Sequence, residues 1–349
     1  MVRAARNETA PTDTDLAWCH ATVPAVSRTF AITIDVLDEP MSSRICLGYL
    51  ICRIADTIED ASHVPPAAKV DLLERFDAVL DPDATTDAAT FVDAVSHWVP
   101  DEPGAEWDLV METPRVFGAF EETSPSTRTA MRAPMRELVQ GLALFVDRHA
   151  ATEGLRIRSR RELEEYCHYA AGTVGELITN LTVLGADVEA AELRDRGHAF
   201  GILLQLVNIA KDVHDDYEAE NNVYLPSNWL AEEGVDQEEV CAREHREGSA
   251  AVVRRTVAHA RTFVDDAETY LHRAPFANGR SLAAWGIPFL LAIGTMRELS
   301  ARPAAAVAPG AVKVDRPEVL AIIDAVTDDP TPERISELRA AVADEPLAP

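Results

Sequence analysis

The sequence predicts an all-α protein folded as one helical bundle. From residue 16 onward, apolar side chains mostly recur with the spacing of amphipathic helices, and the alternating runs that indicate strands are few. Polar segments rich in Pro, Gly, Asp and Ser separate these patterns at 81–87, 100–104 and 124–126. Helices are expected at about 66–80, 88–99, 105–121, 127–149, 281–299, 316–326 and 331–343, with two more between about 236 and 273.

The chain shows no internal domain boundary in its pattern of helices and breaks. Residues 1–15 are polar and lack an apolar segment, so we expect a flexible tail rather than a signal peptide. One domain is expected over 16–326, followed by a C-terminal helix and tail at 327–349. Because no run of 18 or more uncharged apolar residues occurs, no transmembrane anchor is expected. We expect a cytoplasmic protein.

The charge balance is strongly acidic. The chain has 32 Lys and Arg residues against 59 Asp and Glu residues, which gives a net charge of −27. This charge argues against nucleic acid and anionic membrane surfaces as partners, and it indicates a salt-rich cytoplasm in which self-repulsion is screened. We therefore expect a halophilic source. Lysine occurs only at Lys69, Lys211 and Lys313, so each of them deserves a physical reason.

The first acidic cluster ends an apolar stretch at 49–60. Asp56, Glu59 and Asp60 are spaced i, i+3 and i+4, which places them on one face of a helix. Tyr49 and Arg53 lie on the preceding turns of that face. The intervening residues are apolar all round, as in a helix inside a bundle.

A second stretch repeats this design at 200–216. Its acidic residues Asp212, Asp215 and Asp216 have the same spacing, and Gln205 and Asn208 precede them on the same face. One such triple should arise by chance about once or twice in so acidic a chain. Two triples that both end apolar runs and both carry polar partners upstream favour one paired site over two solvated helix ends.

Carboxylates crowded in this way need a cation. Burying like charges together is costly, and carboxylate oxygens select hard ions, so Mg²⁺ with a phosphate-bearing ligand is the expected occupant. Lys211 directly precedes the second triple. Ser27 and Arg28 begin a Ser-Arg-Thr-Phe segment upstream, where Arg28 could bind an anion with two parallel hydrogen bonds.

A third stretch reads Tyr-Cys-His-Tyr-Ala-Ala-Gly-Thr-Val-Gly from Tyr166 to Gly175. Gly172 and Gly175 lower helix propensity by about 1 kcal/mol each, which suggests close approach of another helix or of an apolar ligand at a cavity wall. From these residues alone, Tyr166 and Tyr169 fit core aromatics best.

Together these motifs resemble the squalene branch of the squalene/phytoene synthase family over about residues 20–326. The resemblance is carried by Ser-Arg-Thr-Phe, Asp-Thr-Ile-Glu-Asp, the Tyr166–Gly175 stretch, Gln-Leu-Val-Asn-Ile-Ala-Lys-Asp-Val-His-Asp-Asp, and the weaker Ile-Pro-Phe-Leu-Leu-Ala-Ile and Gly-Ala-Val-Lys-Val segments. It implies a single catalytic domain at 16–326, with the isoprenoid-synthase bundle and its central cavity.

The resemblance implies that two molecules of farnesyl diphosphate are joined head to head through presqualene diphosphate. Reduction by NADPH would then give squalene, and a peripheral membrane contact would serve product release. The two acidic triples would hold Mg²⁺. The remaining roles would be catalysis for Tyr166, Tyr49, Asp56 and Asp212, substrate binding for Ser27, Arg28, Arg53, Gln205, Asn208 and Lys211, and cofactor binding for Lys313 and Asn208.

Three departures from the family pattern leave alternatives open. Ala284 or Trp285 occupies the region where an aromatic residue is expected to shield the second half-reaction. Asn221, Asn222 and Val223 stand where the family usually has Gly-Arg before an aromatic-Pro closure, so one diphosphate contact is missing or comes from elsewhere. Asp315 follows Lys313 closely, in a region that tends to be basic in squalene synthases. The alternatives are a phytoene or dehydrosqualene synthase, which couples without reduction, and a non-catalytic helical assembly factor.

Overall fold

The computed structural model describes residues 14–152, 154–186, 188–310 and 312–348. The all-α prediction is confirmed, since the described residues form helices and short helical turns, with one isolated bridge between Arg156 and Val223. The first helices are α1 (Asp15–Val26), α2 (Arg28–Val36), α3 (Met41–Asp60), α4 (Pro66–Leu80), α5 (Ala88–Val95), α6 (Ala105–Met111), α7 (Thr113–Glu121) and α8 (Pro125–Arg148). The later ones are α9 (Arg160–Cys167), the π-helical turn η3 (His168–Gly172), α10 (Thr173–Thr182), α11 (Ala190–Glu220), α12 (Ser227–Glu232), α13 (Arg246–Ala260), α14 (Val264–Arg273), α15 (Gly279–Ala301), α16 (Arg316–Asp328) and α17 (Pro332–Asp344).

Helix starts follow the capping residues in the sequence. Ser124, Ser159 and Asn278 each accept a hydrogen bond from a backbone N–H three residues on, which satisfies a group that the first turn leaves unpaired. The helix expected at 105–121 is two helices, α6 and α7. Pro114 lies in the first turn of α7, where its missing N–H costs nothing, whereas inside one long helix it would remove a hydrogen bond.

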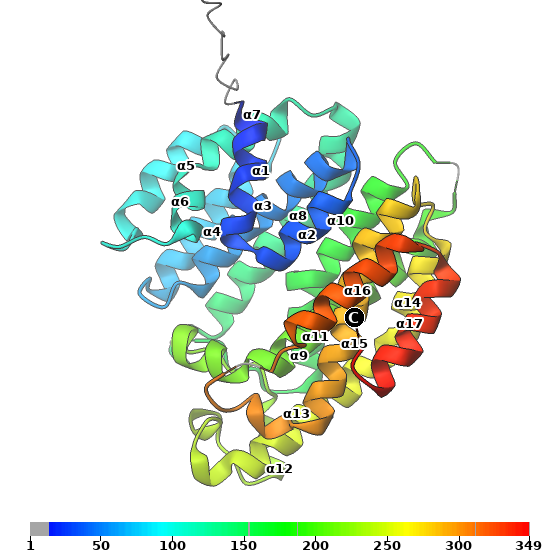
Figure 1. Cartoon of the computed structure of the whole chain (residues 1–349). Coiled ribbons are helices and arrows are strands. Elements are labelled where there is room, and N and C mark those ends of the chain that lie inside the picture. The colour runs from blue at the N-terminus through cyan, green and yellow to red at the C-terminus, as the bar shows by residue number, and fades with distance from the viewer. Residues whose placement is uncertain (1–13, 153, 187, 311, 349) are drawn as a thin grey trace, which may run out of the picture.

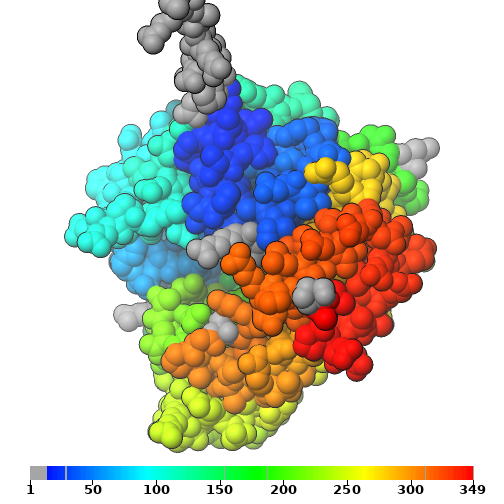
Figure 2. Space-filling view, viewed as in Figure 1, coloured from blue at the N-terminus to red at the C-terminus, as the bar shows by residue number. Residues whose placement is uncertain are grey.

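Helices α3 and α11 lie in two groups of helices that together make up the bundle. Figure 1 shows the N-terminal helices α1–α7 on one side of the molecule and α13–α17 on the other. Helix α3 packs against α8, α4 and α7, while α11 packs against α10, α14 and α13. Helix α10 contacts α8, α11 and α3, so it joins the two groups. In the space-filling view, α16 and α17 form a surface beside the N-terminal helices (Figure 2).

Helix α15 is the most apolar long helix of the bundle. By length and composition it could cross a membrane, yet 78% of its apolar window is buried inside the protein, as in a core helix. It packs against α2, α11, α16 and α17. Among the described residues, no other helix passes this length and composition test.

The chain ends depart slightly from the expected boundaries. Helix α1 already begins at Asp15, whose carboxylate pairs with Arg115 at 3.1 Å, so this residue belongs to the bundle rather than to the tail. Residues 1–13 lie outside the described part. Helix α16 runs through the expected boundary at 326, and α17 buries Ile335, Leu338 and Val342 against the bundle. The C-terminal helix is therefore packed on the same core.

Candidate active site

The acidic ends of α3 and α11 face one cavity of about 460 Å³. Both helices present a polar stripe on an otherwise buried surface, and α9 with η3 closes another side. The lining residues are Val26, Ser27, Tyr49, Arg53, Asp56, Glu59, Asp60, Tyr166, Ala170, Gln205, Asn208, Ile209, Lys211, Asp212, Asp216, Glu220 and Tyr224. The structure thus brings together two motifs that lie about 150 residues apart in the sequence.

On α3, the first acidic triple faces the cavity as expected. Asp56, Glu59 and Asp60 all line it, and Glu59 is only 4% exposed. Tyr49 stacks on Phe30, with ring centroids 4.3 Å apart. This stacking fixes the tyrosine at the cavity edge, one turn before Arg53.

On α11, the face that meets the cavity differs from the expected one. Asn208, Asp212, Asp216 and Glu220 are spaced i, i+4 and form the lining stripe. Asp215 is not among the lining residues; its side chain is 59% exposed and its Oδ1 atom lies 3.4 Å from Nδ1 of His214. Glu220 occupies the stripe instead. A role for Asp215 as a metal ligand stays a prediction.

The cavity carboxyls strongly perturb one another. Burial raises the pKa of Asp56 to about 7, and nearby Asp60 adds to this effect while Arg53 opposes it. Burial also raises the pKa of Glu220 to about 8 and that of Asp216 to about 9, with further repulsion from the neighbouring carboxylates. Burial likewise raises the pKa of Glu59 well above its ordinary value. The protein alone therefore supplies too little positive charge for this cluster.

A hard cation fits the cluster. The Oε1 atom of Glu59 is buried and has no hydrogen-bond partner, although a buried carboxylate oxygen normally has one. A set of carboxylate oxygens suits Mg²⁺, which binds oxygen ligands and a substrate phosphate together. Asp56, Glu59, Asp60, Asp212 and Asp216 are therefore the residues that would hold it.

Protein cations lie at the rim of the cluster. Arg53 lines the cavity and approaches Glu106, with Nη2 and Oε1 3.6 Å apart. Lys211 pairs with the carboxylate of Asp212. Lys69, on α4, donates from Nζ to the main-chain carbonyl of Glu59 at 2.6 Å. The side chain of Arg28 lies outside the described part of the structure, and its role in substrate binding stays a prediction.

Lys69 opens onto a second pocket of about 350 Å³ that shares Glu59 with the cavity. Asn221 and Asn222 line the same pocket. Asn221 ends α11 in the left-handed conformation, with φ 57°, and its Oδ1 atom accepts a hydrogen bond from Nη2 of Arg156 at 2.8 Å. Lys69 is thus the ammonium group beside the position where the family usually carries arginine.

Tyr166 is buried in the cavity wall and is paired with Tyr224. The two hydroxyl oxygens lie 3.2 Å apart, and the Tyr224 oxygen also accepts a hydrogen bond from Nδ2 of Asn222 at 3.2 Å. Burial, with the carboxylates of Glu59 and Asp60, raises the pKa of Tyr166 well above its ordinary value. Both phenols therefore hold their protons at neutral pH.

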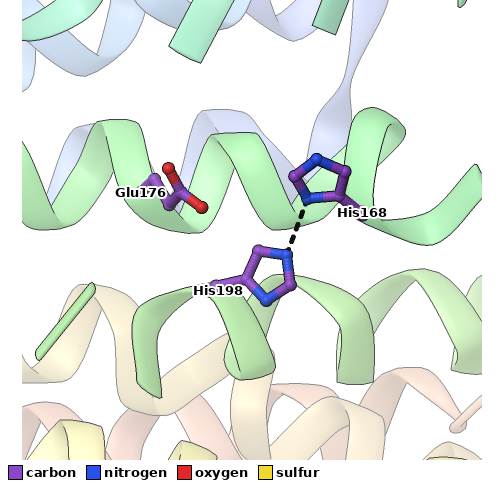
Figure 3. Close-up of side chains that lie close together, drawn as sticks. All are labelled: His168, Glu176 and His198. Carbon is purple, nitrogen blue, oxygen red and sulfur yellow. Dashed lines mark hydrogen bonds between the residues drawn. The ribbon is translucent and has the colours of Figure 1, made fainter. Parts of the chain in front are cut away.

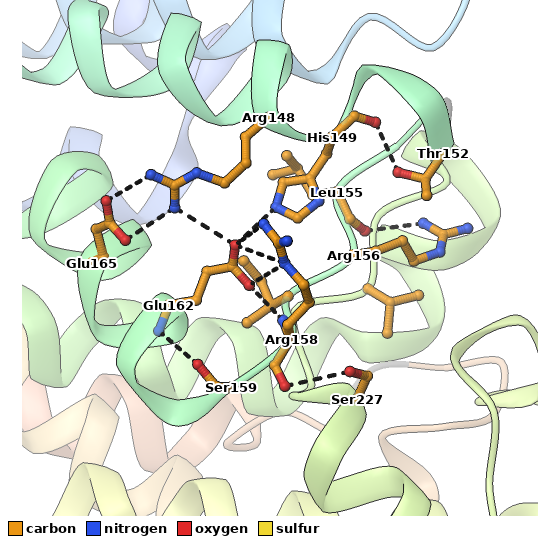
Figure 4. Close-up of polar contacts among 12 residues, drawn as sticks. Arg148, His149, Thr152, Leu155, Arg156, Arg158, Ser159, Glu162, Glu165 and Ser227 are labelled. Carbon is orange, nitrogen blue, oxygen red and sulfur yellow. Dashed lines mark hydrogen bonds and ion pairs between the residues drawn. The ribbon is translucent and has the colours of Figure 1, made fainter.

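An ion-pair network around the buried Glu162 anchors the helix that carries Tyr166 (Figure 4). Glu162, one turn earlier on α9, accepts from the backbone N–H of Arg158 at 2.6 Å and pairs with the guanidinium groups of Arg158 and Arg148. Arg148 also bonds both oxygens of Glu165, at 2.9 and 2.8 Å. The start of α9 is therefore fixed to α8, which holds the Tyr166 side chain in place.

The remaining predicted residues have different positions. Ser27 lines the cavity and caps α2, its Oγ atom accepting from the N–H of Phe30 at 3.1 Å. Asn208 and Gln205 line the cavity one and two turns before Asp212. Lys313 is exposed and does not line it. Gly172 and Gly175 permit close helix packing, because a side chain there would meet His198 and the Gly197 carbonyl of α11.

Three polar residues at or beside the cavity were not predicted as site residues. Glu220 continues the i, i+4 stripe beyond the recognised triple, and this spacing was a usable signal. The only sequence feature that singled out Lys69 was the scarcity of lysine in the chain. Tyr224 lies in the segment after α11, and only the fold brings it to Tyr166.

Comparison with known proteins identifies the family. The squalene/phytoene synthase family model matches residues 23–318. The chain belongs to this family. Within it, the chain is 30% identical to a squalene synthase of Botryococcus braunii over 60% of this chain and 42% of that protein, and 28% identical to the presqualene diphosphate synthase of that organism over 60% and 48%. Human squalene synthase is 25% identical over 92% of this chain and 72% of its own length.

Solved structures share the fold. A structure of TcSQS with the ligand BPH1237 has a TM-score of 0.80, covering 94% of this chain and 90% of that chain at 23% identity. A dehydrosqualene synthase structure has a TM-score of 0.61, covering 95% and 97% at 18% identity. The isoprenoid-synthase bundle expected from the family resemblance is thereby confirmed. The chain nevertheless spans about half the length of the two Botryococcus relatives.

Proposed function

We propose that the protein is a prenyltransferase that joins two molecules of farnesyl diphosphate head to head and then reduces presqualene diphosphate to squalene with NADPH. The observation that carries this proposal is the meeting of two carboxylate-bearing helix faces and a buried tyrosine pair at one cavity. Family membership supports the same reaction class. Burying several carboxyls together costs free energy, and a non-catalytic assembly factor does not require such an arrangement.

The first step requires loss of diphosphate from an allylic carbon. Mg²⁺ bound by the cavity carboxylates would neutralise the developing negative charge on the leaving group. Arg53, Lys211 and Lys69 lie at the edge of the cluster and add fixed positive charge there. Helices α3, α4 and α11 hold these groups in place before substrate arrives, so little reorganisation is needed in the transition state.

The coupling step forms a cyclopropane and releases a proton. Tyr166 is the proposed acceptor, as the family resemblance implies. Because its phenol stays protonated, it can accept a proton only while passing its own to a neighbour. Tyr224 lies within hydrogen-bond distance and is therefore the proposed relay partner, which passes its own proton in turn to the released diphosphate or a carboxylate of the cavity that it lines.

The reductive step rests on the loop that carries Lys313. The carbonyl of Ala306, earlier in this loop, accepts a hydrogen bond from the backbone N–H of His214 at 3.0 Å, so the loop adjoins the acidic end of α11. Asp315 caps α16, and Glu318 pairs with Arg297 at 2.7 Å. Within the described residues, Lys313 makes no ion pair. Its exposed ammonium group therefore suits a cofactor phosphate, with Asn208 at the cavity as a second contact.

Coupling without reduction is the second candidate function. It is favoured by the similarity to a presqualene diphosphate synthase, which is 28% identical against 30% for a squalene synthase.

The proposed location of the protein is the cytoplasm. The proposed route of product release is a transient contact with a membrane.

Product analysis tests this proposal. Purified protein with Mg²⁺ at high salt receives farnesyl or geranylgeranyl diphosphate, each with and without NADPH. We expect presqualene diphosphate from farnesyl diphosphate alone and squalene when NADPH is added. Phytoene from the longer substrate, or dehydrosqualene in place of squalene, would replace the assignment with the second candidate.

A further inference from the structure

Two histidines and a glutamate outside the cavity form a second cluster. His168 begins η3, Glu176 lies on α10, and His198 lies on α11. One nitrogen or oxygen of each side chain lies within 4.8 Å of the other two. Figure 3 shows His198 pointing from α11 toward the helical segment that carries both His168 and Glu176. None of the three lines the cavity described above.

The π-helical turn brings His168 and Glu176 onto one face. Eight residues of ideal α-helix rotate by about 80° beyond two full turns, which would separate their side chains. The π-helical turn at His168–Gly172 absorbs one extra residue and cancels most of this rotation. Such turns are rare and occur frequently at functional sites.

Gly172 leaves the space that the His198 ring occupies. A Cβ atom at this position would lie 2.5 Å from both Cδ2 and Nε2 of His198, a distance that no side chain tolerates. The glycine thus lowers local helix propensity and admits an imidazole between the two helices.

Hydrogen bonds already orient His168 as a metal ligand. Its Nε2 atom lies 3.2 Å from Oε1 of Glu137 on α8, and since a carboxylate only accepts, this nitrogen carries the proton. Its Nδ1 lone pair then faces Nε2 of His198, 2.8 Å away. A histidine that donates one N–H to a carboxylate and directs its other nitrogen inward has the usual arrangement of a metal-bound imidazole.

We propose that His168, His198 and Glu176 bind one divalent transition-metal ion, with Zn²⁺ as the representative. Two imidazole nitrogens and one carboxylate suit this class of ion, and water completes the coordination. The site differs in chemistry from the all-oxygen cavity, which suits Mg²⁺. A bound ion would fasten η3, which directly follows the helix of Tyr166, to α11. This inference does not depend on the proposed reaction.

Binding of Zn²⁺ in the presence of excess Mg²⁺ tests the proposal. Metal-stripped full-length protein is titrated with Zn²⁺ in a calorimeter, and with Co²⁺ while its visible absorption reports histidine ligation. We expect one ion per chain. His198→Ala and Glu176→Gln should each weaken binding by at least about 100-fold, and Glu137→Gln by about 10- to 100-fold, as for contacts that orient a ligand.

Two controls separate this site from others. His97→Ala removes an exposed histidine on the 3₁₀ turn after α5 and should leave Zn²⁺ binding unchanged. Asp56→Asn alters the cavity and should also leave it unchanged. The proposal is overturned if the parent binds no Zn²⁺ under these conditions, or if Glu176→Gln binds it as the parent does. Glu176 is partly exposed, so this variant decides the matter even if His198→Ala does not fold.

Discussion

The hydroxyl oxygens of Tyr166 and Tyr224 lie 3.2 Å apart in the wall of the carboxylate-lined cavity. The two rings are tilted at 34° with centroids 4.8 Å apart, and Phe145 packs against the edge of Tyr166. Tyr224 comes from the segment after α11, and Tyr166 comes from α9. This contact therefore couples the proposed proton acceptor to the chain that follows the second acidic helix.

Removing either hydroxyl tests this coupling. We expect Tyr166→Phe to lower kcat by at least about 100-fold with little change in KM, the scale of a positioned acid or base. Tyr224→Phe should also lower kcat, but by less, because Tyr166 keeps its own hydroxyl. Steady-state turnover of farnesyl diphosphate measures both effects. Tyr169→Phe is the matched control, since Tyr169 lies near His168 and does not line the cavity; parental activity in Tyr166→Phe would reduce Tyr166 to a core aromatic.

The carboxylates separate cavity residues from their exposed neighbour. Asp56→Asn and Asp212→Asn should each abolish product formation while the fold is retained, because each removes an oxygen ligand from a site built from both helices. EDTA should have the same effect. Asp215→Asn should retain much more activity, because its side chain is 59% exposed and does not line the cavity. Equal losses at Asp212 and Asp215 would show that the i, i+4 stripe does not define the site.

The buried carboxyls make the metal-free protein sensitive to pH. Asp56, Glu220 and Asp216 have pKa values raised to about 7, 8 and 9, so the folded state holds protons that the unfolded chain releases near pH 4. The contribution of these groups to the free energy of unfolding should therefore be greatest below about pH 4. It should fall as the pH rises to about 9. Chemical denaturation at a series of pH values, with EDTA present to keep the protein free of metal, measures the slope at which the free energy of unfolding changes with pH. Asp216→Asn and saturating Mg²⁺ should both flatten it, and an unchanged slope in both would contradict the assignment.

Lys313 tests the reductive step. Lys313→Ala should spare formation of presqualene diphosphate, raise the KM for NADPH and make the intermediate accumulate, with little change in Mg²⁺ dependence. Chromatography of the products measures each effect. Lys69→Met is the contrasting variant, because Lys69 adjoins the carboxylate cluster and its loss should slow coupling itself. Squalene formation by Lys313→Ala at the parental NADPH dependence would remove this lysine from the cofactor site.

The net charge of −27 predicts a stability that depends on salt. Screening of repulsion between exposed carboxylates should raise the melting temperature as KCl replaces dilute buffer. Thermal unfolding over a KCl series, repeated with a non-ionic osmolyte, measures this effect. A melting temperature that does not change with KCl would contradict the halophilic interpretation.

Helix periodicity predicted most of the fold, and its failures have local causes. The helix at 66–80 was predicted at its observed bounds because proline starts it and a polar break follows. The pattern at 105–121 hid a break, since apolar spacing continues across Pro114. Lys69 and Tyr224 could not be placed, because their relation to the acidic helices depends on how distant segments pack.

The spacing of the acidic residues predicted which helices meet at the cavity, but not every side chain that faces it. Asp212 and Asp216 face the cavity, but Glu220 rather than Asp215 completes the α11 stripe. The i, i+3, i+4 triple spans an arc of the helix, and packing of α11 against α10, α14 and α13 selects which edge of the arc meets the cavity. That selection depends on the rotation of α11 about its axis, which the sequence pattern leaves open.

The stoichiometry of diphosphate release tests the central claim most directly. Release is measured against farnesyl diphosphate consumed, with and without NADPH, by the parent protein with Mg²⁺ at high salt. Head-to-head coupling followed by reduction predicts one diphosphate per two substrate molecules without NADPH and two per two with it. Release of two per two without NADPH, or no release in either condition, would contradict the account.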